Sequence, residues 1–204
     1  MAHYPIMLAG GKFKLLAVVV GGGEVGRRRV ESLTAAGAAV RLVEPAGGDW
    51  PAGIQCVHEK YRPEHLASAR LVFACTDDAA INARIAADGR AIGAWVNRAD
   101  DPADSDFTVP AVWRGETIVL AVATESGSPT VAAALRDELA AAIPAQADAF
   151  AAAMADFRGQ VKSTIADAAR RAAILRRLAS AEGFARFRAG GREALAEWLK
   201  SLLG

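Results

Sequence analysis

The sequence has few of the residues that build disulfide frameworks and metal centres. It contains two cysteines and three histidines in 204 residues, and none of them stand at the spacing of metal ligands. The thiols Cys56 and Cys75 lie in apolar, strand-like segments, which favours buried free thiols. We expect structural or surface roles for His3, His58 and His65. The sequence therefore predicts neither a disulfide framework nor a metal site.

Long hydrophobic runs and a strong net charge are also missing. No apolar stretch reaches the roughly 18 residues that a membrane helix needs, and the first residues lack the pattern of a signal peptide. We therefore expect a cytoplasmic protein without a membrane partner. The net charge is +1, although residues 145–204 carry ten Lys and Arg against six Asp and Glu. A basic helical tail of this kind is more typical of a solvated face or an oligomer contact than of a nucleic-acid site.

Short apolar runs recur along the first 125 residues, and alanine-rich segments with charges at helical spacing separate some of them. We expect strands at 15–20, 40–44, 54–57, 71–75, 92–96 and 117–122, and helices at 79–90 and 130–143. This alternation is typical of an α/β protein with a doubly wound parallel sheet, here a single sheet of five to seven strands.

The most informative segment is a glycine-rich turn. The run Leu15–Val20 before it fits a strand that is buried on both faces. In the G-x-G-x-x-G pattern, Gly21 permits a tight bend, Gly23 lets the backbone approach a pyrophosphate, and Gly26 lets a helix pack on the strand. Glu44 ends the next strand, where its carboxylate can bind both ribose hydroxyls and so favour NAD over NADP; the alternative is a solvated carboxylate. The pattern predicts a dinucleotide-binding βαβ unit.

The residues beyond Ile143 predict helices only. One apolar stripe recurs by four and three, which predicts a helix of about five turns that packs on its own sheet or across a dimer axis. The stripe consists of Val161, Ile165, Ala168, Ala172, Leu175 and Ala179. We expect glycines to divide the remainder into two short helices, the last with an apolar face. These glycines are Gly183, Gly190 and Gly191, and the face consists of Leu195, Trp198, Leu199 and Leu202.

Polar residues follow three of the expected strands, and we expect all three loops on one rim, where parallel sheets bind ligands. The first loop holds Thr76 and Asp77, which would border the cofactor or simply cap the next helix. The third loop would present N–H groups around Gly127 to an anion such as a substrate carboxylate. Ser128 followed by Pro129 is equally a strong helix start.

The second loop carries four carboxylates within seven residues, Asp100, Asp101, Asp104 and Asp106. A carboxylate desolvated beside like charges has a raised pKa, which suits a catalytic acid or base near neutral pH. The spacing is not that of a calcium loop. For Asp104 and Asp106 we expect a solvated loop.

Five motifs in register resemble those of the precorrin-2 dehydrogenase family, which includes the dehydrogenase–chelatase domain of bacterial siroheme synthase. The resemblance runs over residues 4–143. The motifs are Tyr4-Pro5-Ile6 with the glycine turn, Ala74 to Asn82, Val96 to Asp100, Asp106 to Ala111, and Ser128-Pro129 with the helix after it.

This resemblance implies a Rossmann-like domain over 1–112, a dimerisation region over 113–144 and an all-helical domain over 145–204, in a homodimer of interlocked chains. It also implies NAD-dependent oxidation of the tetrapyrrole precorrin-2 to sirohydrochlorin, with Asp100 as the essential aspartate of the family's Asn-x-x-Asp stretch. The arginine-rich tail would then supply partners for the carboxylates of the tetrapyrrole. Expected cofactor contacts are Gly21, Gly22, Gly23, Glu24, Val25, Gly26, Glu44, Pro45, Thr76, Asp77 and Asn97; expected substrate contacts are Asn97, Thr124, Ser126, Gly127 and Ser128.

Two alternatives stay open. The protein could be a bifunctional enzyme that also inserts ferrous or cobaltous ion into sirohydrochlorin, with the ion as a substrate. It could instead be an NAD-sensing regulatory module without catalysis, since such modules share this fold. A sensor usually carries a DNA-reading helix pair or a membrane span, and the sequence predicts neither.

Overall fold

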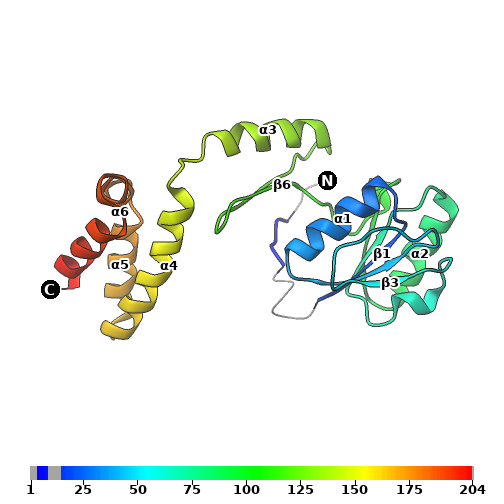
Figure 1. The fold of residues 1–204 in the computed structure, drawn as a ribbon, viewed down its shortest axis with the longest axis horizontal. Coiled ribbons are helices and arrows are strands. Elements are labelled where there is room, and N and C mark those ends of the chain that lie inside the picture. Colours follow the sequence, from blue (N-terminus) through cyan, green and yellow to red (C-terminus); the bar gives the residue numbers. More distant parts are fainter. Residues whose placement is uncertain (1–3, 9–14, 204) are drawn as a thin grey trace. The chain divides into compact units, whose positions relative to one another are not determined.

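The computed structural model describes residues 4–8 and 15–203, so His3 lies outside the described residues. Figure 1 traces the chain, which divides into a first unit that ends at Val109 and a second unit that begins at Pro110. The expected α/β fold with a mostly parallel, Rossmann-like sheet and a helical C-terminal part is confirmed. Within the described ranges, no helix combines the length and the apolar composition that crossing a bilayer requires.

The first unit is built on five parallel strands in the order β3-β2-β1-β4-β5. Their bounds are β1 (Leu16–Val20), β2 (Ala39–Val43), β3 (Gln55–Val57), β4 (Leu71–Ala74) and β5 (Trp95–Arg98). This order is that of a dinucleotide-binding sheet, in which β1 and β4 lie side by side where the direction of winding reverses. The carboxyl ends of these two strands are therefore the expected ligand edge.

Helices cover both faces of this sheet. Val19 packs with Val30 of α1 (Glu24–Ala35), whereas its neighbour Val18 packs with Ile85 of α2 (Ala79–Ala91). Successive side chains of a strand point to opposite faces, so a strand covered on both sides needs an unbroken apolar run. This is the physical reason for the run that was visible before the glycine turn.

Strand β5 lies two to three residues later than the expected strand 92–96. Helix α2 continues to Ala91, and the chain then turns through Gly93 at φ 75°, with the Ala94 N–H donating to the Gly89 carbonyl. The turn removes Ile92 from the strand. As a result Asn97 and Arg98, which were expected in a loop, are buried strand residues.

The second unit begins with an antiparallel ribbon of β6 (Ala111–Arg114) and β7 (Val119–Val122). The expectation that residues 117–122 extend one large sheet was therefore wrong. The connection is short, and the Gly115 N–H closes it by donating to the Ile118 carbonyl, so β7 pairs with its nearest neighbour in sequence. The loop after β7 consequently does not follow a strand of the parallel sheet. Helix α3 (Pro129–Ala141) packs on both strands of the ribbon.

Three helices complete the second unit: α4 (Ala147–Thr164), α5 (Ala168–Leu178) and α6 (Ala181–Leu203). The single helix expected from 161 to 179 was wrong. Ile165 is extended, and Asp167 starts α5 afresh by accepting a hydrogen bond from the Arg170 N–H at 2.6 Å. The break rotates the buried face of α5 to Ile174 and Leu178 and leaves Ala172 exposed.

Helix α6 bends where two of the expected breaks lie. Gly190 and Gly191 have non-helical backbone angles, and Gly191 has φ 63°, which favours glycine. Gly183 divides nothing; a Cβ there would lie 1.8 Å from the Leu178 carbonyl oxygen, so this glycine permits close packing. The apolar face expected at the end of the chain is confirmed, since Leu195, Trp198 and Leu199 are buried and Leu202 packs against them.

Candidate active site

Each glycine of the turn after β1 has a distinct environment. A Cβ on Gly21, which has φ 100°, would lie 2.5 Å from the Cys75 carbonyl oxygen, and one on Gly26 would lie 1.9 Å from the Gly21 carbonyl oxygen. Gly23 differs, because nothing lies within 4 Å of the place where its Cβ would be. Gly21 and Gly26 thus hold the turn against its neighbours, and Gly23 leaves open space for a ligand.

Helix α1 begins at this turn without a side-chain cap, because its N-cap residue is Gly23. The first N–H groups of such a helix attract anions, and a pyrophosphate is a suitable one. Of the other expected cofactor residues here, Glu24 is exposed, whereas Val25 packs into the core.

Glu44 lies at the end of β2 with its carboxylate turned toward the glycine turn. Its Oε2 accepts the Gly22 N–H at 2.5 Å and its Oε1 accepts the Ala46 N–H at 2.9 Å. Pro45, which follows, is exposed. The carboxylate is therefore held in place by backbone donors beside the expected ribose position.

Trp50 is a neighbour of this region that the sequence pattern did not identify. A Cβ on Gly22 would come within 2.9 Å of its ring, and the guanidinium of Arg27 lies 4.3 Å from a ring centroid. Its Nε1 is buried and has no hydrogen-bond partner among the described residues. The only signal for it was a tryptophan inside a glycine-rich loop.

The loop after β4 is fixed by a buried asparagine. Asn82 is fully buried, its Oδ1 accepts the Thr76 hydroxyl at 2.7 Å, and its Nδ2 donates to the Thr76 carbonyl at 3.0 Å. The alternative that Thr76 or Asp77 caps α2 was wrong, since Asp78 accepts the N–H groups of Ala80 and Ile81. Thr76 is thus held at the ligand edge, and Asp77 is exposed.

Asp100 lies just after β5 and is paired with Arg98, for which the sequence motifs predicted no role. Arg98 Nη2 donates to Asp100 Oδ2 at 2.7 Å, while Nη1 donates to Asp104 Oδ2 at 2.8 Å. The Arg98 side chain is 10% exposed and that of Asp100 28%. The available signal was a charged residue inside a buried strand, directly before an acidic cluster. Asn97 is buried and donates to the Phe107 carbonyl at 2.9 Å.

The outer aspartates keep contact with solvent, with side chains 41% exposed for Asp104 and 30% for Asp106, but both are also paired with arginines. Arg90 Nη1 donates to Asp104 at 2.9 Å and its Nε to Asp106 at 3.0 Å. Asp106 also accepts the Val96 N–H at 2.8 Å, which anchors the loop to β5. Two arginines therefore offset part of the negative charge of the cluster.

These pairs reverse the expected direction of one pKa shift. The Arg98 guanidinium, assisted by the Asn82 side chain, holds the pKa of Asp100 below its usual range, although like-charged neighbours were expected to raise it. The pKa of Asp104 is lowered by Arg98 and Arg90 in the same way. Asp100 is consequently an ionised carboxylate near neutral pH, and this form can accept a proton.

The expected substrate loop belongs to the second unit. Ser128 caps α3, with its Oγ accepting the Val131 N–H at 3.4 Å, and the Thr124 hydroxyl accepts the Ser128 N–H at 3.0 Å. Gly127 has φ 67°, and Ser126 is exposed. The capping interpretation of Ser128 is confirmed, and a substrate contact from this loop stays a prediction.

Comparisons with known proteins agree with this geometry. A family model described as putative NAD(P)-binding matches residues 14–111. The siroheme synthase of Pseudomonas putida (strain W619) is 36% identical over 175 residues, which cover 82% of this chain and 37% of that protein. Siroheme synthase 1 of Aeromonas salmonicida (strain A449) is 31% identical over 192 residues, covering 91% and 41%. The chain thus spans less than half the length of these relatives.

A solved structure, that of SirC, precorrin-2 dehydrogenase, matches 98% of this chain and 100% of its own chain with a TM-score of 0.75. At 18% identity this likeness shows a shared fold. Fold, glycine turn and family model together define a class, the Rossmann-like proteins that bind a nicotinamide nucleotide. The siroheme synthases narrow that class, because they match 82% and 91% of this chain at 36% and 31% identity.

Proposed function

We propose that this chain catalyses the NAD-dependent oxidation of precorrin-2 to sirohydrochlorin. The observation that carries the proposal is the Asp100 carboxylate, which is held ionised by Arg98 just beyond β5, whose neighbour β4 adjoins the strand of the glycine turn. The names of the relatives support the same activity, and they give no support to a regulatory module.

In this mechanism the chain positions the reactants and takes up a proton. When bound, NAD supplies the hydride acceptor. The glycine turn and the start of α1 bind its pyrophosphate, and Glu44 orients its ribose. Asp100 accepts the proton that leaves the macrocycle, and the Arg98 pair keeps its carboxylate in the basic form and in one orientation.

The acidic residue at the end of β2 favours NAD over NADP. Both oxygens of Glu44 are directed by backbone N–H groups, so its negative charge stays beside the turn. A 2′-phosphate at that position would meet a like charge, whereas a free 2′-hydroxyl would donate a hydrogen bond to it.

A second copy of the chain is the proposed partner of α3. Val131, Leu135 and Leu139 recur every four residues along this helix and are 48%, 46% and 49% exposed. Contiguous exposed apolar residues are typical of protein interfaces. A homodimer through residues 113–144 would bury this stripe.

The proposed compartment is the cytoplasm. Cys56 and Cys75 are both free thiols, and burial raises the pKa of Cys75 to about 11, which makes it unreactive. Free thiols of this kind are typical of reducing compartments.

The test is NADH formation from precorrin-2, followed by absorbance. Asp100→Ala should lower the rate by about 100-fold or more, because a positioned general base contributes about that much, while NADH binding is retained. Asp101→Ala is the comparison variant: this neighbouring carboxylate caps the turn at Pro102–Asp104 and lies 3.7 Å from Arg98 Nη1, so its loss should lower the rate far less than that of Asp100. Full activity of Asp100→Ala would contradict the proposal. Ferrous ion added to sirohydrochlorin without NAD tests the bifunctional alternative in the same preparation.

A further inference from the structure

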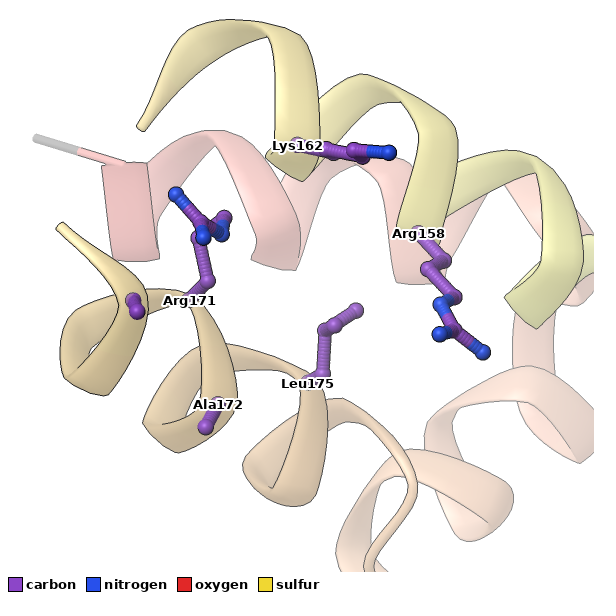
Figure 2. A pocket seen from close by; sticks show the side chains of 6 residues that line it. Arg158, Lys162, Arg171, Ala172 and Leu175 are labelled. Carbon is purple, nitrogen blue, oxygen red and sulfur yellow. The ribbon is translucent and has the colours of Figure 1, made fainter. Parts of the chain in front are cut away.

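A cavity of about 320 Å³ lies between α4 and α5 (Figure 2). Its volume is at the lower end of the range of small-molecule sites, about 300–1,000 Å³. Three cationic side chains and three apolar ones line it, and no acidic residue does. The lining residues are Arg158, Lys162, Ala168, Arg171, Ala172 and Leu175.

Two of these cations have no partner within the described residues. Arg158 and Lys162 lie one turn apart on α4, so their like charges repel, and neither side chain makes a hydrogen bond or an ion pair in the described part of the chain. Elsewhere in the same helical bundle, Arg192 pairs with Asp156 and Arg186 with Glu182. Arg158 and Lys162 therefore bring two uncompensated positive charges to the cavity.

The third cation is held in place. Arg171 Nη1 donates to the carbonyls of Ile165 and Ala166 at 3.0 and 2.6 Å, which fixes the guanidinium at the break between α4 and α5. In Figure 2 its head group projects from α5 into the region beside α4, from which Arg158 and Lys162 project. Part of the cost of ordering a cationic contact is thus already met by the fold.

The apolar lining comes from the small-residue stripe that was visible in the sequence. Ala168 and Ala172 are exposed and line the cavity, and Leu175 extends the apolar surface by a further turn. Small side chains leave room that a flat apolar group can occupy. The cavity therefore combines an apolar wall with three positive charges at its margin.

We propose that this cavity is a binding site for an amphipathic polycarboxylate, with an apolar ring edge against the alanines and Leu175 and carboxylates on Arg158, Lys162 and Arg171. The substrate and product of the proposed function, on which this inference rests, have this chemistry, because both are macrocycles that bear carboxylate side chains. An acidic tetrapyrrole is therefore the occupant, and the site belongs to the helical part of the chain.

Uroporphyrin, a stable octacarboxylate tetrapyrrole, is the probe, and its fluorescence reports binding to the intact protein. The double variant Arg158→Gln/Lys162→Gln should weaken binding about tenfold, because charge-assisted hydrogen bonds to carboxylates are lost. The matched control Arg176→Gln/Lys200→Gln also removes one arginine and one lysine charge, but from exposed positions outside the cavity. It should bind uroporphyrin as the unaltered protein does. An unchanged dissociation constant for the first variant, or an equal loss in both, would overturn the site.

A second variant tests the apolar wall without changing charge. Ala172→Phe places a ring in the cavity from an exposed position and should also weaken uroporphyrin binding, while the helical circular dichroism stays the same. NADH formation from precorrin-2 by the unaltered protein separates the two proposals. Oxidation without any effect of the cavity variants on binding sinks the site alone, and uroporphyrin binding without oxidation sinks the proposed function alone.

Discussion

The two units of the chain differ in how the charges near their proposed sites are paired. In the first unit Arg98 and Arg90 are paired with the aspartates of the loop after β5. In the second unit Arg158 and Lys162 have no partner in the described part of the chain, and α3 exposes an apolar stripe. Internal pairing holds reacting groups in one geometry, whereas open cations and apolar side chains are free to meet another molecule. We therefore expect the first unit to carry the reacting groups and the second to offer surfaces for other molecules.

The hydrophobic cores of the two units are built from different elements and residues. Valines on both faces of a parallel sheet dominate the first core, and the ladder fixes where each strand ends. Aromatic side chains join the helices of the second core, with Phe150 lying 5.0 Å from Phe184 and 5.4 Å from Phe187 between ring centroids. A sheet edge positions catalytic groups accurately, and packed helices present long side chains on their outer surfaces.

The largest effect is expected from a charge on the α3 stripe. Leu135→Glu should dissociate the proposed dimer, with a rise of about 100-fold or more in its dissociation constant, because burying an unpaired carboxylate is costly. Sedimentation velocity measures this. Ala141→Glu puts the same charge on the same helix away from the stripe and should leave the dimer intact. NAD affinity should not change in either variant. A loss of NAD affinity in Leu135→Glu would mean that NAD binding by the first unit depends on α3.

The complementary change is Gly23→Ala in the first unit. Its backbone suits alanine and nothing lies within 4 Å of the new Cβ, so the thermal unfolding temperature should not change. NAD affinity should fall about tenfold, because the methyl group occupies the approach of the pyrophosphate. Gly21→Ala is the contrast, since its positive φ and the nearby Cys75 carbonyl should lower stability by about 1–3 kcal/mol as well. Unchanged NAD affinity in Gly23→Ala would place the pyrophosphate elsewhere.

A smaller and pH-dependent effect is expected for Arg98→Met. Arg98 holds the pKa of Asp100 below its usual range, so removal of the guanidinium raises that pKa. The protonated, inactive form of Asp100 then persists to higher pH. The acidic limb of the kcat/KM profile therefore shifts to higher pH, while the alkaline limb keeps its position. Equal loss of activity at every pH would mean that Arg98 supports the loop without tuning Asp100.

The βαβ unit could be predicted because its signals are local. A buried strand needs an apolar run, and the tight turn needs Gly21, so both leave marks in adjacent residues. The end of β5 left no such mark, because it depends on where α2 stops and on pairing with β4. This is why Asn97 and Arg98 were expected in a loop.

The charge pattern of the site could be found in the sequence but not interpreted correctly. Four nearby aspartates suggested that their charges repel one another. The arginines that pair with them could not be identified from the loop, because Arg90 lies in α2 and Arg98 inside β5. Arg90 lies 14 residues before Asp104, and only the fold brings them together. Likewise, periodicity alone joined α4 to α5, although Asp167 before an alanine-rich run was a cap signal at the break. The ion pairs of the aspartates thus depend on contacts between residues far apart in the sequence, which local patterns do not reveal.

The smallest effect is expected from Glu44, the carboxylate at the end of β2. Its replacement tests whether this residue makes the first unit prefer NAD over NADP. Glu44→Ala should lower the preference for NAD over NADP by about tenfold, because a 2′-phosphate no longer meets a like charge. The ratio of the two kcat/KM values measures this, and Glu31→Ala, an exposed acidic residue on α1, is the control for net charge. If the ratio does not move, Glu44 only ties the turn together through the Gly22 and Ala46 N–H groups. Cofactor choice would then have to come from other residues around the turn, and Arg27 and Trp50 are two candidates beside it.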